Sequence, residues 1–136
     1  MYKYCSLFIL LVIFSCSDNS NNSTFTGTDS ATTLAKATVQ EMDQETFKIV
    51  NKKSGVFVLD VRTPAEIADG KIRGAIEVDY KAAGFKDKLD KLPRDKKYII
   101  YCKSGGRSSK TANMMVDMGF QEVFNLTGGF SAYTEE

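Results

Sequence analysis

The chain has 136 residues, enough for one domain, with 43% hydrophobic residues, 26% charged residues and a formal net charge of +1. These values are ordinary for a soluble globular protein, and the balanced charge shows no sign of the basic face that nucleic-acid binding requires. The chain contains no histidine, which excludes Ser-His-Asp and Cys-His hydrolases and most zinc sites. Its 3 cysteines are scattered without the spacing of metal ligands. We therefore expect neither a metal nor a cofactor.

The first residues are typical of a targeting segment. Lys3 provides a small positive region, and residues 7–14 form an apolar run that is too short to span a bilayer, which takes about 20 helical residues. The sequence Ile-Phe-Ser-Cys at positions 13–16 resembles a bacterial lipobox. This resemblance implies a lipoprotein signal peptide at residues 1–15 and lipidation of Cys16. An ordinary cleaved signal peptide and an uncleaved anchor are the alternatives.

The segment after the lipobox predicts a disordered tether at residues 16–37. Residues 17–33 are rich in Ser, Asn, Thr and Asp and contain a single aromatic residue, Phe25. Such a segment buries too little apolar area to offset the entropy that ordering would cost. Together with the lipobox, it predicts a protein anchored by lipid in the bacterial cell envelope, facing the periplasm or the exterior. The folded domain is expected at residues 38–136.

The domain begins with a predicted helix and a predicted strand. Asp43 can cap the amino end of a helix that runs to about residue 51. Gly55 ends that unit, and residues 56–59 form a continuous apolar run of strand length. Hydrophobicity without alternation is typical of a parallel strand that is covered on both faces.

A polar connection follows this strand. Asp60 and Arg62 stand at its carboxyl end, where we expect them to orient the connection rather than to act on substrate. Thr63 then caps a short helix, with Pro64 at its first position and Glu66 as the partner in a capping box. Glu66 also lies four residues beyond Arg62 and can pair with it if both residues are helical.

The remainder of the chain continues to alternate strands with helices. The predicted elements are strands at residues 75–78, 98–101 and 123–126 and helices at residues 85–92 and 109–118. Pro93 ends the first of these helices, and residues 128–129 form a Gly-Gly turn. The alternation predicts an α/β fold: an open, mostly parallel sheet of about five strands flanked by helices. In such sheets ligands bind at the carboxyl ends of the strands, where Cys102 stands.

Residues 102–108, with the sequence Cys-Lys-Ser-Gly-Gly-Arg-Ser, carry most of the functional information. The glycines allow the backbone to curl so that its N–H groups point inward, and the following helix adds its positive end. A thiol in such an anion cradle is shifted toward the thiolate, which is the nucleophilic form. Arg107 stands at a helix start, where the helix dipole disfavours a cation, and this placement indicates an anion nearby.

Four segments in register resemble the single-domain rhodaneses, the thiosulfate sulfurtransferase family. They are Val-Leu-Asp-Val-Arg-Thr-Pro-Ala-Glu at 58–66, Gly-Lys-Ile-Arg-Gly-Ala-Ile at 70–76, Tyr-Cys-Lys-Ser-Gly-Gly-Arg-Ser at 101–108 and Leu-Thr-Gly-Gly-Phe at 126–130. Their order and spacing match the family over residues 38–135. The chain departs from the family at Lys71, where members often have His, and at Arg73, where they often have Pro. These two cations could bias the choice of partner.

The resemblance implies a reaction and its participants. The catalytic thiolate of Cys102 would take the outer sulfur of thiosulfate or a similar donor, release sulfite, and pass the persulfide sulfur to cyanide, a thiol or a protein acceptor. By the same carry-over, the substrate-binding residues are Lys103, Ser104, Gly105, Gly106, Arg107 and Ser108. Arg107 would hold the sulfonate-like end of the donor through two N–H groups, with Lys103 as a point charge. Lys103 could equally face solvent.

Three further expectations accompany this interpretation. Cys102 would be the only free thiol after processing, which disfavours a disulfide, and we expect a monomer that binds no nucleic acid. The methionines at positions 114, 115 and 118 are interpreted as helix packing rather than metal ligands.

Two other functions stay open. The domain could be a membrane-tethered persulfide carrier that supplies one partner without efficient thiosulfate turnover. It could also be a cysteine phosphatase or arsenate reductase on a similar fold. In those enzymes the loop between cysteine and arginine is one residue longer than residues 103–106, and the shorter loop suits a sulfur atom on Cys102 better than a tetrahedral oxyanion. The chain also has no histidine to serve as a general acid.

Overall fold

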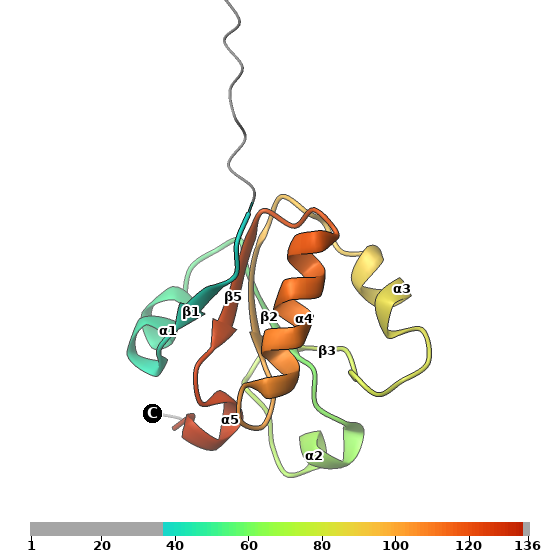
Figure 1. Cartoon of the computed structure of the whole chain (residues 1–136). Coiled ribbons are helices and arrows are strands. Elements are labelled where there is room, and N and C mark those ends of the chain that lie inside the picture. Colours follow the sequence, from blue (N-terminus) through green and yellow to red (C-terminus); the bar gives the residue numbers. More distant parts are fainter. Residues whose placement is uncertain (1–36, 135–136) are drawn as a thin grey trace, which may run out of the picture. The chain divides into compact units, whose positions relative to one another are not determined.

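The computed structural model describes residues 37–134, in which strands alternate with helices (Figure 1). The predicted signal peptide, the lipidation of Cys16 and the tether lie outside the described residues. The strands are β1 (Gln40–Met42), β2 (Val56–Asp60), β3 (Ile76–Glu77), β4 (Lys97–Tyr101) and β5 (Glu122–Leu126). The helices are α1 (Gln44–Val50), α2 (Pro64–Ala68), α3 (Phe85–Asp90), α4 (Gly106–Asp117) and α5 (Gly129–Ala132).

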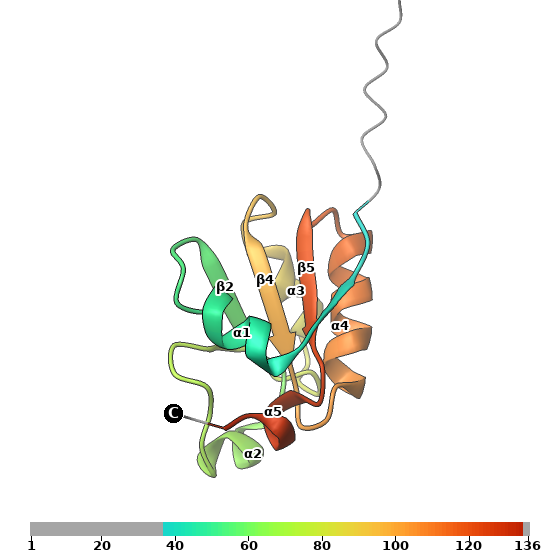
Figure 2. The ribbon, with the colours of Figure 1, turned by 90° about the vertical axis from the view of Figure 1, so that its left-hand side faces the viewer.

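The strands form one parallel sheet in the order β1-β5-β4-β2-β3. Helix α1 covers one face of this sheet, whereas α3 and α4 cover the other (Figure 1, Figure 2). The short helices α2 and α5 lie near the carboxyl ends of the strands. The predicted α/β fold, a parallel sheet of five strands flanked by helices, is confirmed.

The central strand β4 shows why a continuous apolar run is needed there. Tyr98 and Ile100 pack on the side of α3 and α4, Ile99 and Tyr101 pack on the side of α1, and all four are 0% exposed. Because successive side chains of a strand point to opposite faces, the next residue returns to the side of α4. Cys102 accordingly joins the core beneath α4 and is only 1% exposed.

Several boundaries differ from those predicted. Strand β1 was not predicted, because its sequence Gln-Glu-Met carries no apolar run. Helix α4 begins at Gly106 rather than at residue 109, since Gly105 turns the chain directly before it with a φ of 109°. Helix α3 ends at Asp90, two residues early, and β3 keeps only Ile76 and Glu77. Helix α4 ends at Asp117, one residue before the predicted end, and Gly119 follows with a φ of 89°.

The methionines of α4 contribute to packing, as predicted. Met115 is fully buried, and Met114 and Met118 pack against the same core cluster. Within residues 37–134, no group of three or more His, Cys, Asp or Glu side chains is arranged to hold a metal ion. None of the helices in this part of the chain combines the length and hydrophobicity needed to cross a membrane.

Candidate active site

The loop after β4 curls around the sulfur atom of Cys102. The backbone N–H of Gly105 donates a hydrogen bond to Sγ at 3.2 Å, and the hydroxyl of Ser108 donates to Sγ at 3.6 Å. Gly105 adopts a left-handed backbone conformation that glycine accommodates without strain. Helix α4 starts at the next residue, so its positive amino end adjoins the loop.

These donors favour the thiolate form of Cys102. Burial has the largest single influence and by itself raises the pKa, because it disfavours the charged sulfur. Hydrogen bonds from the backbone N–H and the hydroxyl of Ser108, and from the backbone N–H groups of Gly105 and Ser104, outweigh it. The pKa of Cys102 is therefore lowered from its ordinary value, and the thiol is activated without a histidine.

The rest of the predicted binding loop lies at the mouth of the cradle. Lys103, Ser104 and Gly106 are exposed, whereas Ser108 is buried, and the carbonyl of Gly105, at 2.9 Å, is a second acceptor for the one proton of its hydroxyl. A cavity of about 160 Å³ adjoins this loop. It is lined by Arg62, Glu66, Asp69, Lys103, Phe130 and Ser131.

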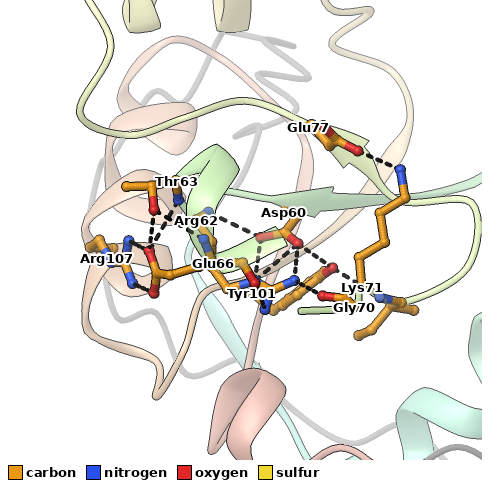
Figure 3. Close-up of polar contacts among 10 residues, drawn as sticks. Asp60, Arg62, Thr63, Glu66, Gly70, Lys71, Glu77, Tyr101 and Arg107 are labelled. Atoms are coloured by element: carbon orange, nitrogen blue, oxygen red, sulfur yellow. Dashed lines mark hydrogen bonds and ion pairs between the residues drawn. The ribbon is translucent and has the colours of Figure 1, made fainter. Parts of the chain in front are cut away.

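Asp60 and Arg62 form a buried network at the carboxyl end of β2 (Figure 3). Their exposed fractions are 0% and 3%. Nε and Nη2 of Arg62 donate to the carboxylate of Asp60 at 2.6 to 3.0 Å, and the hydroxyl of Tyr101 donates to the same carboxylate at 2.6 Å. The guanidinium also donates to the carbonyls of Glu66 and Gly70. The structure thus places the pair where it braces the connection after β2, with its charges matched inside the protein.

Arg107 is held by Glu66 (Figure 3). Its Nη1 and Nη2 donate to the two carboxylate oxygens at 2.8 and 2.6 Å. The hydrogen bond from Arg107 is the largest influence on Glu66 and holds the pKa of that carboxyl far below its usual value. The predicted capping box with Thr63 is confirmed. The pairing of Glu66 with Arg62, predicted only if both residues are helical, does not form, because Arg62 precedes α2, turns toward Asp60 and reaches only the backbone oxygen of Glu66.

Two consequences follow for the predicted role of Arg107. The position of Arg107 at a helix start indicates a nearby anion. That anion is present, and it is the carboxylate of Glu66 in α2. The predicted contact between Arg107 and the sulfonate of a donor stays a prediction, and such a donor would have to compete with Glu66.

Helix α5 supports the cradle from the side, although the sequence predicts only a turn at residues 128–129. The N–H of Phe130 donates to the carbonyl of Cys102 at 2.8 Å, and the N–H of Ser131 donates to the carbonyl of Lys103 at 2.9 Å. Gly129, with a φ of 56°, approaches so closely that a Cβ atom there would lie 2.4 Å from the carbonyl oxygen of Cys102. The Gly-Gly pair was the one available signal of this close approach.

Helix α5 is itself held by residues far away in the sequence. The side-chain amide of Gln44, at the start of α1, donates to the carbonyls of Thr127 at 2.8 Å and Gly129 at 3.2 Å. The guanidinium carbon of Arg62 lies 4.0 Å from the centre of the Phe130 ring, a cation–π contact. These contacts connect α1 and the buried network to the cradle.

The two departures from the rhodanese pattern lie outside this loop. Lys71 pairs with Glu77, and both side chains are partly exposed (Figure 3). Arg73 lines a second cavity of about 350 Å³, together with residues of α1 and with Tyr133. Neither cation lines the cavity beside Lys103.

Comparisons with known proteins agree with this geometry. The family model of the rhodanese-like domain matches residues 43–136. A sulfurtransferase of Allochromatium vinosum is 33% identical over 96 residues, which cover 70% of this chain and 88% of that protein. The chloroplastic thiosulfate sulfurtransferase 16 of Arabidopsis thaliana is 37% identical over 92 residues, which cover 60% of this chain and 77% of that protein.

A solved structure extends the agreement to three dimensions. The crystal structure of a rhodanese-like domain protein from Staphylococcus aureus matches with a TM-score of 0.63 and 28% identity, covering 71% of this chain and 93% of that one. Together with the relatives named as sulfurtransferases, this supports sulfurtransferase activity in the broad sense. The chain belongs to the family of rhodanese-like domains.

Proposed function

We propose that this protein transfers a sulfane sulfur from thiosulfate or a similar donor, through a persulfide on Cys102, to a thiophilic acceptor such as cyanide or a thiol. The observation that carries the proposal is the set of N–H and hydroxyl donors around Sγ of Cys102, which lowers the pKa of the thiol. A buried thiol without such donors would have a raised pKa and would be a poor nucleophile.

The reaction balances without an external oxidant or reductant. The thiolate of Cys102 attacks the outer sulfur of the donor, a new S–S bond forms, and the S–S bond of the donor breaks. The leaving group departs with the electron pair of that bond, as sulfite when the donor is thiosulfate. The acceptor then attacks the terminal sulfur of the persulfide, and Cys102 returns as a thiolate.

The cradle is suited to stabilise charge during both steps. After the first step the persulfide anion carries its negative charge on the terminal sulfur, just beyond Sγ of Cys102, and in the second step negative charge returns to Sγ as the thiolate leaves. The N–H of Gly105 and the hydroxyl of Ser108 already point at Sγ. Preorganised donors of this kind stabilise a developing anion without reorganisation.

The test is thiocyanate formation from thiosulfate and cyanide. We expect turnover by the wild type and none above buffer for Cys102→Ser, because serine cannot form the persulfide. Mass spectrometry of donor-treated protein should find one added sulfur on the peptide that contains Cys102. Wild-type turnover no higher than that of Cys102→Ser would favour the carrier function, and hydrolysis of a phosphate ester would contradict both.

We also propose that a lipid on Cys16 anchors the protein, as a monomer, in the bacterial cell envelope. The lipobox-like sequence at positions 13–16 and the polar segment at 17–33 support this proposal. We expect the wild type in the membrane fraction and Cys16→Ala outside it, with Cys5→Ala as a matched control that keeps the lipobox. Wild-type protein that is wholly soluble, lacks residues 1–15 and has an unmodified Cys16 would refute the anchor.

A further inference from the structure

The cations near the cradle are largely neutralised by carboxylates of the chain itself. Arg62 is paired with Asp60, and Arg107 gives both of its amino groups to Glu66. Lys103 is exposed on the wall of the cavity beside the loop, and among the described residues no carboxylate pairs with it. The mouth therefore offers one unpaired positive charge, that of Lys103, to a donor with two negative charges.

We propose that Glu66 determines which sulfur donors the cradle accepts. By pairing with Arg107, it makes the site favour donors that carry at most one negative charge, such as thiosulfonates and alkyl persulfides, over the thiosulfate dianion, which is turned over at a higher KM. The inference rests on the proposed function, because it concerns the donor from which Cys102 takes sulfur.

The position of Arg107 makes it the cation that a dianionic donor would need. The pKa of Arg107 is raised, mainly by its hydrogen bonds to Glu66 and further by the negative charge of Cys102, so the guanidinium is within electrostatic reach of the sulfur. A dianion that approaches the thiolate is repelled unless a cation compensates it. A bidentate pair with a carboxylate is one of the strongest interactions of a guanidinium, so it competes effectively with such a ligand for Arg107.

Glu66 is also fixed in place. The N–H and the hydroxyl of Thr63 donate to its Oε2 at 3.1 and 2.9 Å. Since the pKa of Glu66 lies far below its usual value, the carboxylate is ionised at neutral and mildly acidic pH. Neither rotation nor mild acidification would therefore release Arg107 to a donor.

Thiosulfate and methanethiosulfonate differ in the charge of the donor but undergo the same sulfur-transfer reaction. Methanethiosulfonate replaces one charged oxygen of thiosulfate with a methyl group. Both donors give the same step, in which the thiolate of Cys102 bonds to the outer sulfur and the donor S–S bond breaks. The leaving group takes the electron pair, as sulfite in one case and as methanesulfinate in the other.

The experiment measures KM and kcat for both donors, with cyanide as acceptor, in the wild type and in Glu66→Gln. Glutamine can still serve in the capping box with Thr63. We expect the wild type to have a lower KM for methanethiosulfonate than for thiosulfate. In Glu66→Gln the KM for thiosulfate should fall by about tenfold, the size expected from one charge-assisted contact, while the KM for methanethiosulfonate should change by less than about twofold.

Two further variants isolate the cause. Glu77→Gln removes the same charge from the exposed pair with Lys71 and should leave both KM values unchanged. Glu66→Gln combined with Arg107→Gln should lose the gain for thiosulfate, since the gain requires the freed guanidinium. A third donor, an alkyl persulfide, tested by the mass of the Cys102 peptide, distinguishes persulfides from thiosulfonates as the preferred class.

Three results would overturn the inference. They are an equal change of KM for both donors in Glu66→Gln, a loss of kcat for both donors with KM unchanged, and a gain for thiosulfate that survives the loss of Arg107. If the wild type turns over neither donor and gains no sulfur on Cys102, the proposed function itself fails.

Discussion

Replacing Gly129 with alanine is expected to reduce sulfur transfer by at least about 100-fold, the effect of a misplacement of about 1 Å at a reacting group. The added Cβ would lie 2.4 Å from the carbonyl oxygen of Cys102 and 2.8 Å from that of Lys103. Both neighbours are backbone atoms, so α5 or the cradle must shift, and the hydrogen bond from Phe130 to Cys102 is strained or lost. The rate of thiocyanate formation and the rate at which Cys102 is alkylated at neutral pH measure the effect.

Gly55→Ala is the matched control for this variant. Gly55 has a φ of 79°, in the same left-handed region, but a Cβ there would meet nothing within 4 Å. Gly55→Ala should therefore show the backbone strain alone, about 1 kcal/mol of stability, and full activity. Equal activity of Gly129→Ala and Gly55→Ala would show that α5 does not position the cradle.

Removing the carboxylate of Asp60 is expected to cost about 3–5 kcal/mol of unfolding free energy, as for other broken buried ion pairs. In Asp60→Ala the guanidinium of Arg62, which is 3% exposed, keeps its charge but loses its counterion. The hydroxyl of Tyr101 loses its acceptor as well. Because small domains are stable by only about 5–15 kcal/mol, the variant should lose a large share of its stability. Urea titration of the wild type and the variant gives the difference.

An exposed ion pair supplies the comparison. Asp95 pairs with Lys96, with side chains that are 64% and 41% exposed, and Asp95→Asn should leave the unfolding free energy nearly unchanged. A loss of similar size in Asp60→Ala and Asp95→Asn would mean that water replaces Asp60 as the partner of Arg62, and that the network near β2 is not a structural brace.

The fold was predictable where a short stretch of sequence, such as an apolar run, specifies the element. The apolar run of β4 determines a strand covered on both faces, and the alternation of its side chains carries Cys102 into the core beneath α4. Strand β1 has no such signal. Gln40, Glu41 and Met42 are extended because they pair with Phe124, Asn125 and Leu126 of β5, a contact between the two ends of the domain. Strand formation of this kind depends on neighbours rather than on intrinsic preference.

The candidate site also combines features that the local sequence predicts with features that only the tertiary structure reveals. The capping box of α2 and the curl at Gly105 follow from local chemistry, and both were predictable. The position of Arg107 even indicated an anion, but the partner lies 41 residues away along the chain. Only the fold brings Glu66 to Arg107, and only the fold shows that Gly129 touches the loop. Local motifs identify the reactive thiol, whereas the groups that limit its substrates are chosen by tertiary structure.

The hydrogen bonds of Gln44 also bear on the order of events during folding. This side chain holds carbonyl groups that lie 83 and 85 residues further along the chain. Contacts between such distant residues form late, after shorter-range structure. While the chain is being synthesised or is otherwise unfolded, Cys102 is an ordinary cysteine with no donors gathered around it. The N–H groups of α5 hold the carbonyls of Cys102 and Lys103 only after this helix has docked, so we expect Cys102 to be less reactive in an incompletely folded chain.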